Sequence, residues 1–287
     1  MRFLHCSDIH VTQDYASAPF LRLGWRRWLA MLEVTVGGRG NAYAQAKQTL
    51  RQIAADVELH GADALLISGD LTGYATTDEF VEARDALGHL ADSRATCSVI
   101  PGNHDCFTPN AERTRRFEKY FGHLLVSDLP AYQREGAYPF VHLKGDAAAV
   151  VGLRSARVQL PGFASGTIGP AQLSGLAALL SDHRMAGRAV LVMVHHGPLG
   201  ARGRPDSRIH GLTDGAALLK LLPGPRFAVL HGHIHERYHH VATDARPHMF
   251  CAGSSTQRGH EGYWVIVVAD GVITKGAIHI PRPFPGG

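Results

Sequence analysis

Five short polar segments, each carrying Asp, Asn or His, follow five short apolar runs of the chain. The segments are Asp8-Ile9-His10, Gly69-Asp70, Gly102-Asn103-His104-Asp105, His195-His196-Gly197-Pro198 and His231-Gly232-His233-Ile234-His235. Short apolar runs that alternate with helical patterns are typical of a layered α/β protein, and such sheets bind ligands at the carboxyl ends of their strands. We therefore expect five strand ends to gather these side chains around one crevice.

The same patterns predict the order of the elements. Strands are expected at Arg2–Cys6, Ala64–Ile67, Thr96–Ile100, Phe140–Leu143, Ala147–Leu153, Ala189–Val194, Phe227–Leu230, Met249–Ala252, Tyr263–Val268 and Val272–Ile280. Helices are expected at Ala42–Leu59, Thr77–Leu90, Pro109–Phe121, Pro170–Arg184 and Thr213–Leu222. Pro170 suits a first helical position, Thr213 suits an N-cap, and Asp270-Gly271 suits a hairpin turn. The order predicts an α/β fold with a β-rich C-terminal end.

Composition narrows the class of protein. The 287 residues are 45% hydrophobic and 19% charged, which excludes a disordered chain and a coiled coil. The net charge of +4 suits an anionic ligand but is too small to argue for nucleic acid, so no stable nucleic-acid partner is expected. The 19 histidines are unusual, and histidine is the commonest metal ligand in proteins.

The cysteines and the N-terminus bear on the compartment. The four cysteines have no C-x-x-C spacing, which predicts reduced thiols in a cytosolic protein. Met1–His5 leads into a polar segment without an apolar core, so no signal peptide is expected. No stretch approaches the roughly 18 apolar residues that a membrane helix needs. We therefore expect a cytoplasmic protein.

The residue types in the five segments indicate a metal centre. Carboxylate, imidazole and amide ligands suit Mn, Fe or Zn rather than calcium or an iron–sulfur cluster. The segments offer more ligands than one ion needs, whereas two ions ~3.5–4 Å apart that share a carboxylate would use them all. Two such ions suit phosphoryl chemistry, because a water that bridges them loses a proton near neutral pH and can attack phosphorus in line.

The five motifs, in this order, resemble those of the calcineurin-like metallophosphoesterases. The resemblance runs from Asp8 to His235 and implies a four-layer α/β/β/α sandwich, here one domain over residues 1–287 with an insert at about 18–40. It implies two divalent or trivalent metal ions, with manganese favoured, held by Asp8, His10, Asp70, Asn103, His195, His233 and His235. Asp70 would bridge the ions. His104 would face the substrate phosphate and protonate the leaving oxygen.

One position departs from the family pattern. Many relatives carry an acidic or amide residue three positions after the GD aspartate, where it orients the catalytic histidine, and this chain has Gly73 there. Another group must therefore set the tautomer of His104, and Asp105 and Asp78 are the candidates. His196 neighbours an expected ligand and is given a supporting or pocket role.

Two basic segments allow both a structural and a functional interpretation. In Phe20–Val36, the side chains of Leu21, Trp25, Trp28 and Leu32 would share one face of a helix. This face would either pack on the domain or lie on a membrane surface and grip an acyl chain. Arg202, Arg204 and Arg208 would be either solvated charges or contacts for a second phosphate.

Several functions fit this sequence. The reaction class is hydrolysis of a phosphodiester or pyrophosphate bond. The substrate is either a cyclic nucleotide or other small phosphodiester, or a nucleotide-linked lipid such as UDP-diacylglucosamine. The Trp–Arg segment favours the lipid, because an amphiphile needs an apolar slot beside a phosphate site. The alternatives are a non-catalytic metal-binding scaffold of the same fold and a nuclease.

Overall fold

A computed structural model describes residues 1–13, 27, 42–160 and 162–281 of the chain. Most of the expected insert at about 18–40, including the Trp residues of Phe20–Val36, lies outside the described residues. Arg27 is described and buried, and its guanidinium donates to the carbonyls of Tyr74 and Ala75 at 2.8 and 2.9 Å. Within the described part of the chain, no helix is both long and apolar enough to cross a membrane.

The first sheet contains the strands that precede the first three motifs. Its order is β11-β10-β1-β2-β3, in which β1, β2 and β3 are parallel and β10 and β11 are antiparallel to their neighbours. The strands are β1 (Arg2–Cys6), β2 (Ala64–Ile67), β3 (Cys97–Val99), β10 (Tyr263–Ala269) and β11 (Val272–His279). The helices that follow its strands are α4 (Ala46–Leu59), α5 (Thr77–Leu87), α6 (Pro109–Arg113) and α7 (Arg116–Phe121).

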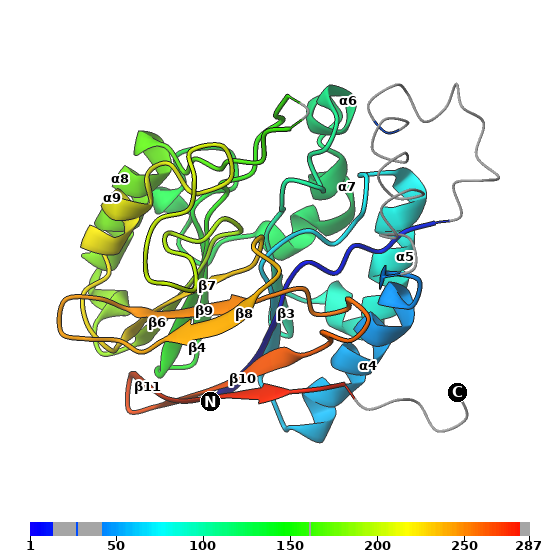
Figure 1. Ribbon diagram of the computed structural model, residues 1–287. Coiled ribbons are helices and arrows are strands. Elements are labelled where there is room, and N and C mark those ends of the chain that lie inside the picture. The colour runs from blue at the N-terminus through cyan, green and yellow to red at the C-terminus, as the bar shows by residue number, and fades with distance from the viewer. Residues whose placement is uncertain (14–26, 28–41, 161, 282–287) are drawn as a thin grey trace.

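The second sheet contains the strands that precede the last two motifs. Its order is β4-β5-β6-β7-β9-β8, with β5, β6, β7 and β9 parallel. The strands are β4 (Phe140–Lys144), β5 (Ala148–Gly152), β6 (Ala189–Met193), β7 (Phe227–His231), β8 (Arg237–His240) and β9 (His248–Ala252). Its helices are α8 (Pro170–Leu180) and α9 (Gly215–Lys220). Figure 1 shows α8 and α9 on one side of the molecule and α4 and α5 on the other.

Alternation along the buried strands separates two cores. In β6, Leu191 and Met193 pack between the sheets, whereas Val190 and Val192 pack against the outer helices. Side chains of a strand point alternately to its two faces, so a strand that is apolar throughout must be covered on both sides. The two sheets therefore face each other with helices outside each, which confirms the expected four-layer α/β/β/α arrangement.

Most expected elements are present, and the differences have local causes. The helix expected at Pro109–Phe121 is broken at Arg115, whose φ is 48°, just after Thr114 bonds back to the carbonyl of Asn110. β8 was not predicted, because its side chains are polar or aromatic and only half-buried at a sheet edge. Short 3₁₀ turns lie at Gly88–Asp92, Gly122–Leu125, Pro130–Tyr132 and His183–Met185.

The N-cap expectation at Thr213 was wrong. The cap of α9 is Asp214, and its carboxylate accepts hydrogen bonds from the backbone N–H groups of Ile168 and Gly169 at 3.1 and 2.8 Å. The helix begins at Gly215, and the Asp214 carboxylate holds the neighbouring loop rather than capping the helix. Pro170 does begin α8, and Asp270-Gly271 does form the β10–β11 turn with φ of 49° and 72°.

Candidate metal centre

Parallel pairing of β1 and β2 continues past their carboxyl ends and joins the first two motifs. The backbone N–H of Asp8 donates to the carbonyl of Gly69 at 3.0 Å, and that of His10 donates to the carbonyl of Asp70 at 2.9 Å. These bonds fix the two loops in register after the strands have ended. Asp8, His10 and Asp70 are thereby held at one sheet edge.

Backbone strain is concentrated on the expected ligands. Asp8, His10, Asp70, His233 and His235 all have positive φ, between 51° and 71°. A non-glycine residue in this left-handed region costs roughly 1–3 kcal/mol, and such residues cluster at functional sites. The surrounding structure therefore holds these five side chains in a conformation that the local chain disfavours.

Glycines allow the motif loops to approach one another closely. A Cβ on Gly102 would lie 2.1 Å from Oδ1 of Asp70, and a Cβ on Gly232 would lie 2.0 Å from Oδ2 of Asp8. Both separations are far inside van der Waals contact. The GN and GH motifs therefore need glycine, because each glycine backbone packs directly on a carboxylate of the site.

One half of the site gathers Asp8, His10 and His235. Nε2 of His235 lies 3.1 Å from Oδ1 of Asp8, and Nε2 of His10 lies 3.8 Å from the same oxygen. The two imidazole nitrogens are 3.2 Å apart. Oδ2 of Asp70 lies 3.9 Å from Nε2 of His10, so Asp70 borders this half.

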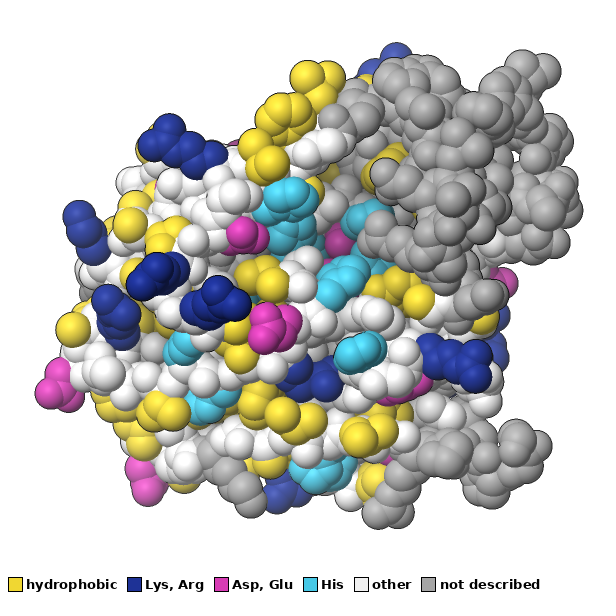
Figure 2. Space-filling view, viewed as in Figure 1, with side chains coloured by type: hydrophobic (Ala, Val, Ile, Leu, Met, Phe, Trp, Pro, Cys, Tyr) yellow, Lys and Arg dark blue, Asp and Glu magenta, His cyan; other side chains and the backbone are white. Residues whose placement is uncertain are grey.

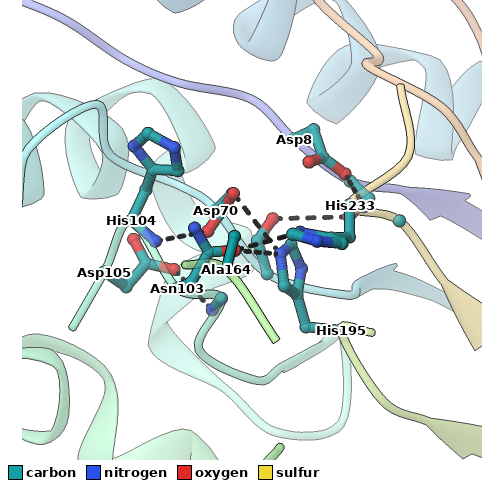
Figure 3. A network of polar contacts seen from close by, with 12 residues as sticks. Asp8, Asp70, Asn103, His104, Asp105, Ala164, His195 and His233 are labelled. Atoms are coloured by element: carbon teal, nitrogen blue, oxygen red, sulfur yellow. Dashed lines mark hydrogen bonds and ion pairs between the residues drawn. The ribbon is translucent and has the colours of Figure 1, made fainter. Parts of the chain in front are cut away.

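The other half gathers Asp70, Asn103, His195 and His233. Nε2 of His195 lies 3.4 Å from Oδ2 of Asp70, the same oxygen that borders the first half. Oδ1 of Asn103 lies 3.0 Å from Nε2 of His195 and 3.1 Å from Nδ1 of His233. Figure 3 shows these side chains converging, with Asp8 joined to the group by a bond from the N–H of His233 at 2.8 Å.

The donor set fits a pair of metal ions. Oδ1 of Asp8 is buried and accepts no hydrogen bond from the described residues. One ligand atom from each of Asp8, His10 and His235 lies within 4.8 Å of the others, and the same holds for Asp8, Asp70 and His195. Carboxylates and imidazoles gathered this closely, with a buried carboxylate oxygen that accepts no hydrogen bond, are the arrangement that a cation stabilises.

The electrostatics of the cluster are those of a site prepared for positive charge. Although burial opposes it, the neighbouring His195 and His104 hold the pKa of Asp70 well below its usual range. Against the effect of burial, Asp70 raises the pKa of His195 to about 9. Burial and His195 lower the pKa of His233 to about 4, so this ring is a neutral donor. The site therefore holds an ionised carboxylate at Asp70 and a neutral imidazole at His233, and His195 would release its proton when a metal ion binds.

His104 is oriented by a main-chain group. Its Nδ1 lies 2.6 Å from the carbonyl of Gly73, so Nδ1–H donates to that oxygen. The carboxylate of Asp105 accepts hydrogen bonds from Leu71, Thr72 and Gly102, and Asp78 is exposed in the first turn of α5. Gly73, which stands where many relatives have an acidic or amide side chain, thus orients the ring of His104 with its backbone carbonyl. When the ring is protonated, its second proton is on Nε2.

Asp105 instead joins two motif loops. It is 1% exposed, and its carboxylate accepts from the N–H groups of Leu71, Thr72 and Gly102 and from the hydroxyl of Thr72, at 2.9 to 3.2 Å. These bonds connect the loop after β2 with the loop after β3. Asp105 therefore sets the position of Asp70 relative to His104.

His196 lies beside the site with both nitrogens engaged. Nδ1 accepts from the Ser155 hydroxyl at 2.8 Å, and Nε2 donates to the carbonyl of Ala164 at 3.0 Å. Its ring centroid is 4.4 Å from that of His233. The arrangement suits a supporting role and leaves no nitrogen for a metal.

Arg202 and Arg204 are exposed on the loop after this motif.

Sequence reasoning missed a group of hydroxyls behind the first half of the site. The Tyr43 hydroxyl lies 3.3 Å from Nδ1 of His235 and 3.0 Å from Oγ of Ser254, which donates to the carbonyl of Asp8 at 2.8 Å. Thr256 donates to the carbonyl of Ile9. Ser254 and Thr256 follow the carboxyl end of β9. The expectation that polar residues at the carboxyl ends of strands form the site could therefore have identified them.

Comparisons with known proteins agree with this geometry. Residues 1–237 match the family model described as calcineurin-like phosphoesterase. The chain therefore belongs to the calcineurin-like phosphoesterase family, a class of metal-dependent phosphoester hydrolases. It is 29% identical over 188 residues to a probable cyclic nucleotide phosphodiesterase of Synechococcus sp. (strain WH7803), a match that covers 63% of this chain and 62% of the relative.

Solved structures share the fold at low sequence identity. A dimetal phosphatase from Danio rerio matches with a TM-score of 0.62 and 14% identity, covering 98% of this chain and 99% of that one. A purple acid phosphatase from yellow lupin matches with a TM-score of 0.53 and 13% identity, covering 99% of this chain and 54% of that one. These similarities establish the sandwich fold.

Proposed function

We propose that the protein is a dinuclear metal-dependent phosphodiesterase that acts on a small phosphodiester. The observation that carries this proposal is the position of Asp70: its Oδ2 lies 3.9 Å from Nε2 of His10 and 3.4 Å from Nε2 of His195. One carboxylate oxygen thus borders both halves of the donor set. When bound, two cations would supply charge neutralisation and water activation for in-line displacement at phosphorus.

The ligands proposed for the two ions follow from the two halves. Asp8, His10 and His235 would hold one ion and Asn103, His195 and His233 the other, with Asp70 shared. Nitrogen and oxygen donors without thiolates suit manganese, iron or zinc, and manganese is the favoured choice. Two sites of this mixed type need no ligand from outside the five motifs.

His104 is the proposed general acid. Its ring centroid lies 4.7 Å from that of His10, so the ring borders the first half of the site. The bond from Nδ1–H to Gly73 fixes the ring and its tautomer. A proton on Nε2 would pass to the leaving oxygen, and a positioned acid of this kind contributes ~10²–10⁴-fold to the rate.

A cyclic nucleotide or similar small diester is the substrate class that we favour. The Synechococcus relative supports this choice, since its name describes a probable cyclic nucleotide phosphodiesterase. The second candidate is a nucleotide-linked lipid, supported by the apolar and basic sequence of Phe20–Val36, which would then contact a membrane surface. In either case the scissile phosphorus would occupy the same metal centre.

A substrate panel tests the proposal. Purified protein would be assayed with Mn²⁺, and again after chelation, on cyclic AMP, bis(4-nitrophenyl) phosphate, UDP-diacylglucosamine and DNA, with Asp70→Asn as the metal-site control. We expect hydrolysis of cyclic AMP and of the aryl diester that disappears on chelation and returns with Mn²⁺. Metal-loaded protein inert on the whole panel would indicate a binding scaffold, and strongly salt-dependent DNA cleavage would indicate a nuclease.

A further inference from the structure

Beside the metal centre, two loops expose three apolar side chains. Leu160, Phe163 and Ile209 are 66%, 50% and 45% exposed, and we call them the apolar lip. Figure 2 shows hydrophobic side chains gathered next to histidines on this face of the molecule. When large apolar side chains are exposed together, they often mark a binding surface, whereas single exposed apolar residues are common on any protein surface.

The lip is built on a fixed framework. The backbone N–H of Ala164 donates to the carbonyl of Ile209 at 2.8 Å, and that of Gly166 donates to the carbonyl of Gly211 at 3.1 Å. The N–H of Phe163 also donates to the carbonyl of Leu160 at 3.0 Å. These backbone bonds hold the two loops side by side, with Phe163 and Ile209 next to one of the bonds that join them.

The framework is attached to the second half of the metal site. The carbonyl of Ala164 accepts the bond from Nε2 of the buried His196, whose ring packs against that of His233. His210, the residue after Ile209, is exposed, and its ring centroid is 6.4 Å from that of His233. The lip thus adjoins the edge of the donor set where His233 lies.

The lip and the proposed general acid lie at different ends of the site. His104 borders the half that contains His10, whereas the lip is tied to His233. Figure 3 shows His104 and His233 at opposite sides of Asp70 and Asn103. In a diester with two separate arms, a leaving oxygen at His104 would place the retained arm on the side of the site where the lip lies. In a cyclic nucleotide one ribose carries both ester oxygens, so the base on that ribose is the group that would extend toward the lip.

We propose that the apolar lip is the subsite for the retained arm of the phosphodiester, and that this arm carries a flat aromatic ring such as a nucleobase. The three exposed side chains offer apolar contacts to a ring, and the exposed His210 imidazole next to Ile209 offers a face for stacking. This inference rests on the proposed function and specifies its substrate class.

Two diesters with the same leaving group test the subsite. Bis(4-nitrophenyl) phosphate retains an aryl arm, and methyl 4-nitrophenyl phosphate retains a methyl arm. We expect Phe163→Ser and Ile209→Ser each to lower the aryl-to-methyl ratio of kcat/KM by about 5–10-fold, mainly through KM for the aryl diester, as for loss of part of an apolar pocket. Leu59→Ser, on the 52% exposed last residue of α4, is the matched control and should keep the wild-type ratio.

A measurement on unmodified protein provides a second test. Phenylphosphonate should inhibit the wild-type enzyme at least about fivefold more tightly than methylphosphonate, because only the former carries a ring for the lip. Equal inhibition, or an unchanged substrate ratio in folded, metal-loaded variants, would overturn the subsite while leaving diesterase activity intact. If the wild-type protein with Mn²⁺ hydrolyses neither diester, the proposed function and the subsite both fall.

Discussion

Replacing Asp105 by Asn probes the junction that positions the two central motifs. The carboxylate is buried and accepts four hydrogen bonds, two on each oxygen. Oδ2 accepts from the N–H groups of Leu71 and Gly102, and Oδ1 accepts from the N–H and hydroxyl of Thr72. Asparagine has the same shape but only one acceptor oxygen, so it cannot satisfy this set of donors.

The loss of stability in Asp105→Asn is worked out for the more favourable of the two orientations of the asparagine amide. With its oxygen toward Leu71 and Gly102, the amide NH₂ faces Thr72. The Thr72 hydroxyl can rotate to accept, but the Thr72 N–H then has no partner. A buried N–H without a partner costs about 1–3 kcal/mol, and the remaining bonds lose the assistance of the carboxylate charge. We expect Asp105→Asn to lower the free energy of unfolding by about 2–3 kcal/mol.

Burial and the neighbouring Asp70 raise the pKa of Asp105 to about 7, so the carboxylate is ionised only above that pH. Urea denaturation of metal-free protein in this pH range measures the cost without a contribution from metal binding. The midpoint should fall while the slope with urea stays constant, which identifies a change in stability rather than in the unfolded state. Asp244→Asn, at an exposed position, is the matched control and should stay within about 0.5 kcal/mol of wild type. If Asp105→Asn also stays within that range, the carboxylate does not join the loops as argued.

Three further predictions concern the acid, the hydroxyl behind the site, and a buried histidine. His104→Gln should retain both metals while kcat falls by ~10²–10⁴-fold; loss of metal, measured by mass spectrometry, would instead make His104 a ligand. Tyr43→Phe removes the hydroxyl 3.3 Å from Nδ1 of His235 and should weaken Mn²⁺ binding about tenfold in a chelator competition, whereas unchanged affinity would exclude a positioning role. Burial and Lys144 lower the pKa of His142 to about 4, below about 6.5 in the unfolded chain, so the unfolded state binds more protons between these values. Stability should therefore fall as pH drops from 6.5 toward 4; His142→Gln should reduce this slope in urea titrations at several pH values, and an identical slope would refute the assignment.

The pattern of apolar residues was sufficient to predict most of the fold. The rule that ligands bind at the carboxyl ends of strands was sufficient to predict that the donor residues lie together. β1 and β2 have the bounds expected from the sequence: β2 is apolar and buried throughout, and β1 is buried from Phe3 to Cys6. The motifs after them meet because parallel strands end at one sheet edge. The positions of the strands, and therefore of the motifs that follow them, can be predicted from the apolar residues alone.

The features that the sequence could not predict depend on contacts between segments that are distant along the chain. No side-chain pattern marks the carbonyl of Gly73 as the partner of His104, because any residue has a carbonyl there. The hydroxyl of Tyr43 reaches His235 across 192 positions, and the edge strand β8 lacks an apolar face. These features follow from tertiary packing rather than from local spacing.

The number of metal ions per chain tests the central claim most directly. Protein loaded with Mn²⁺ and freed of unbound metal would be measured by mass spectrometry beside Asp70→Asn. The shared carboxylate predicts about two ions per wild-type chain and a loss from both halves of the site in the variant. A wild-type chain that binds a single ion, or an Asp70→Asn variant that keeps two, would contradict a centre built around Asp70.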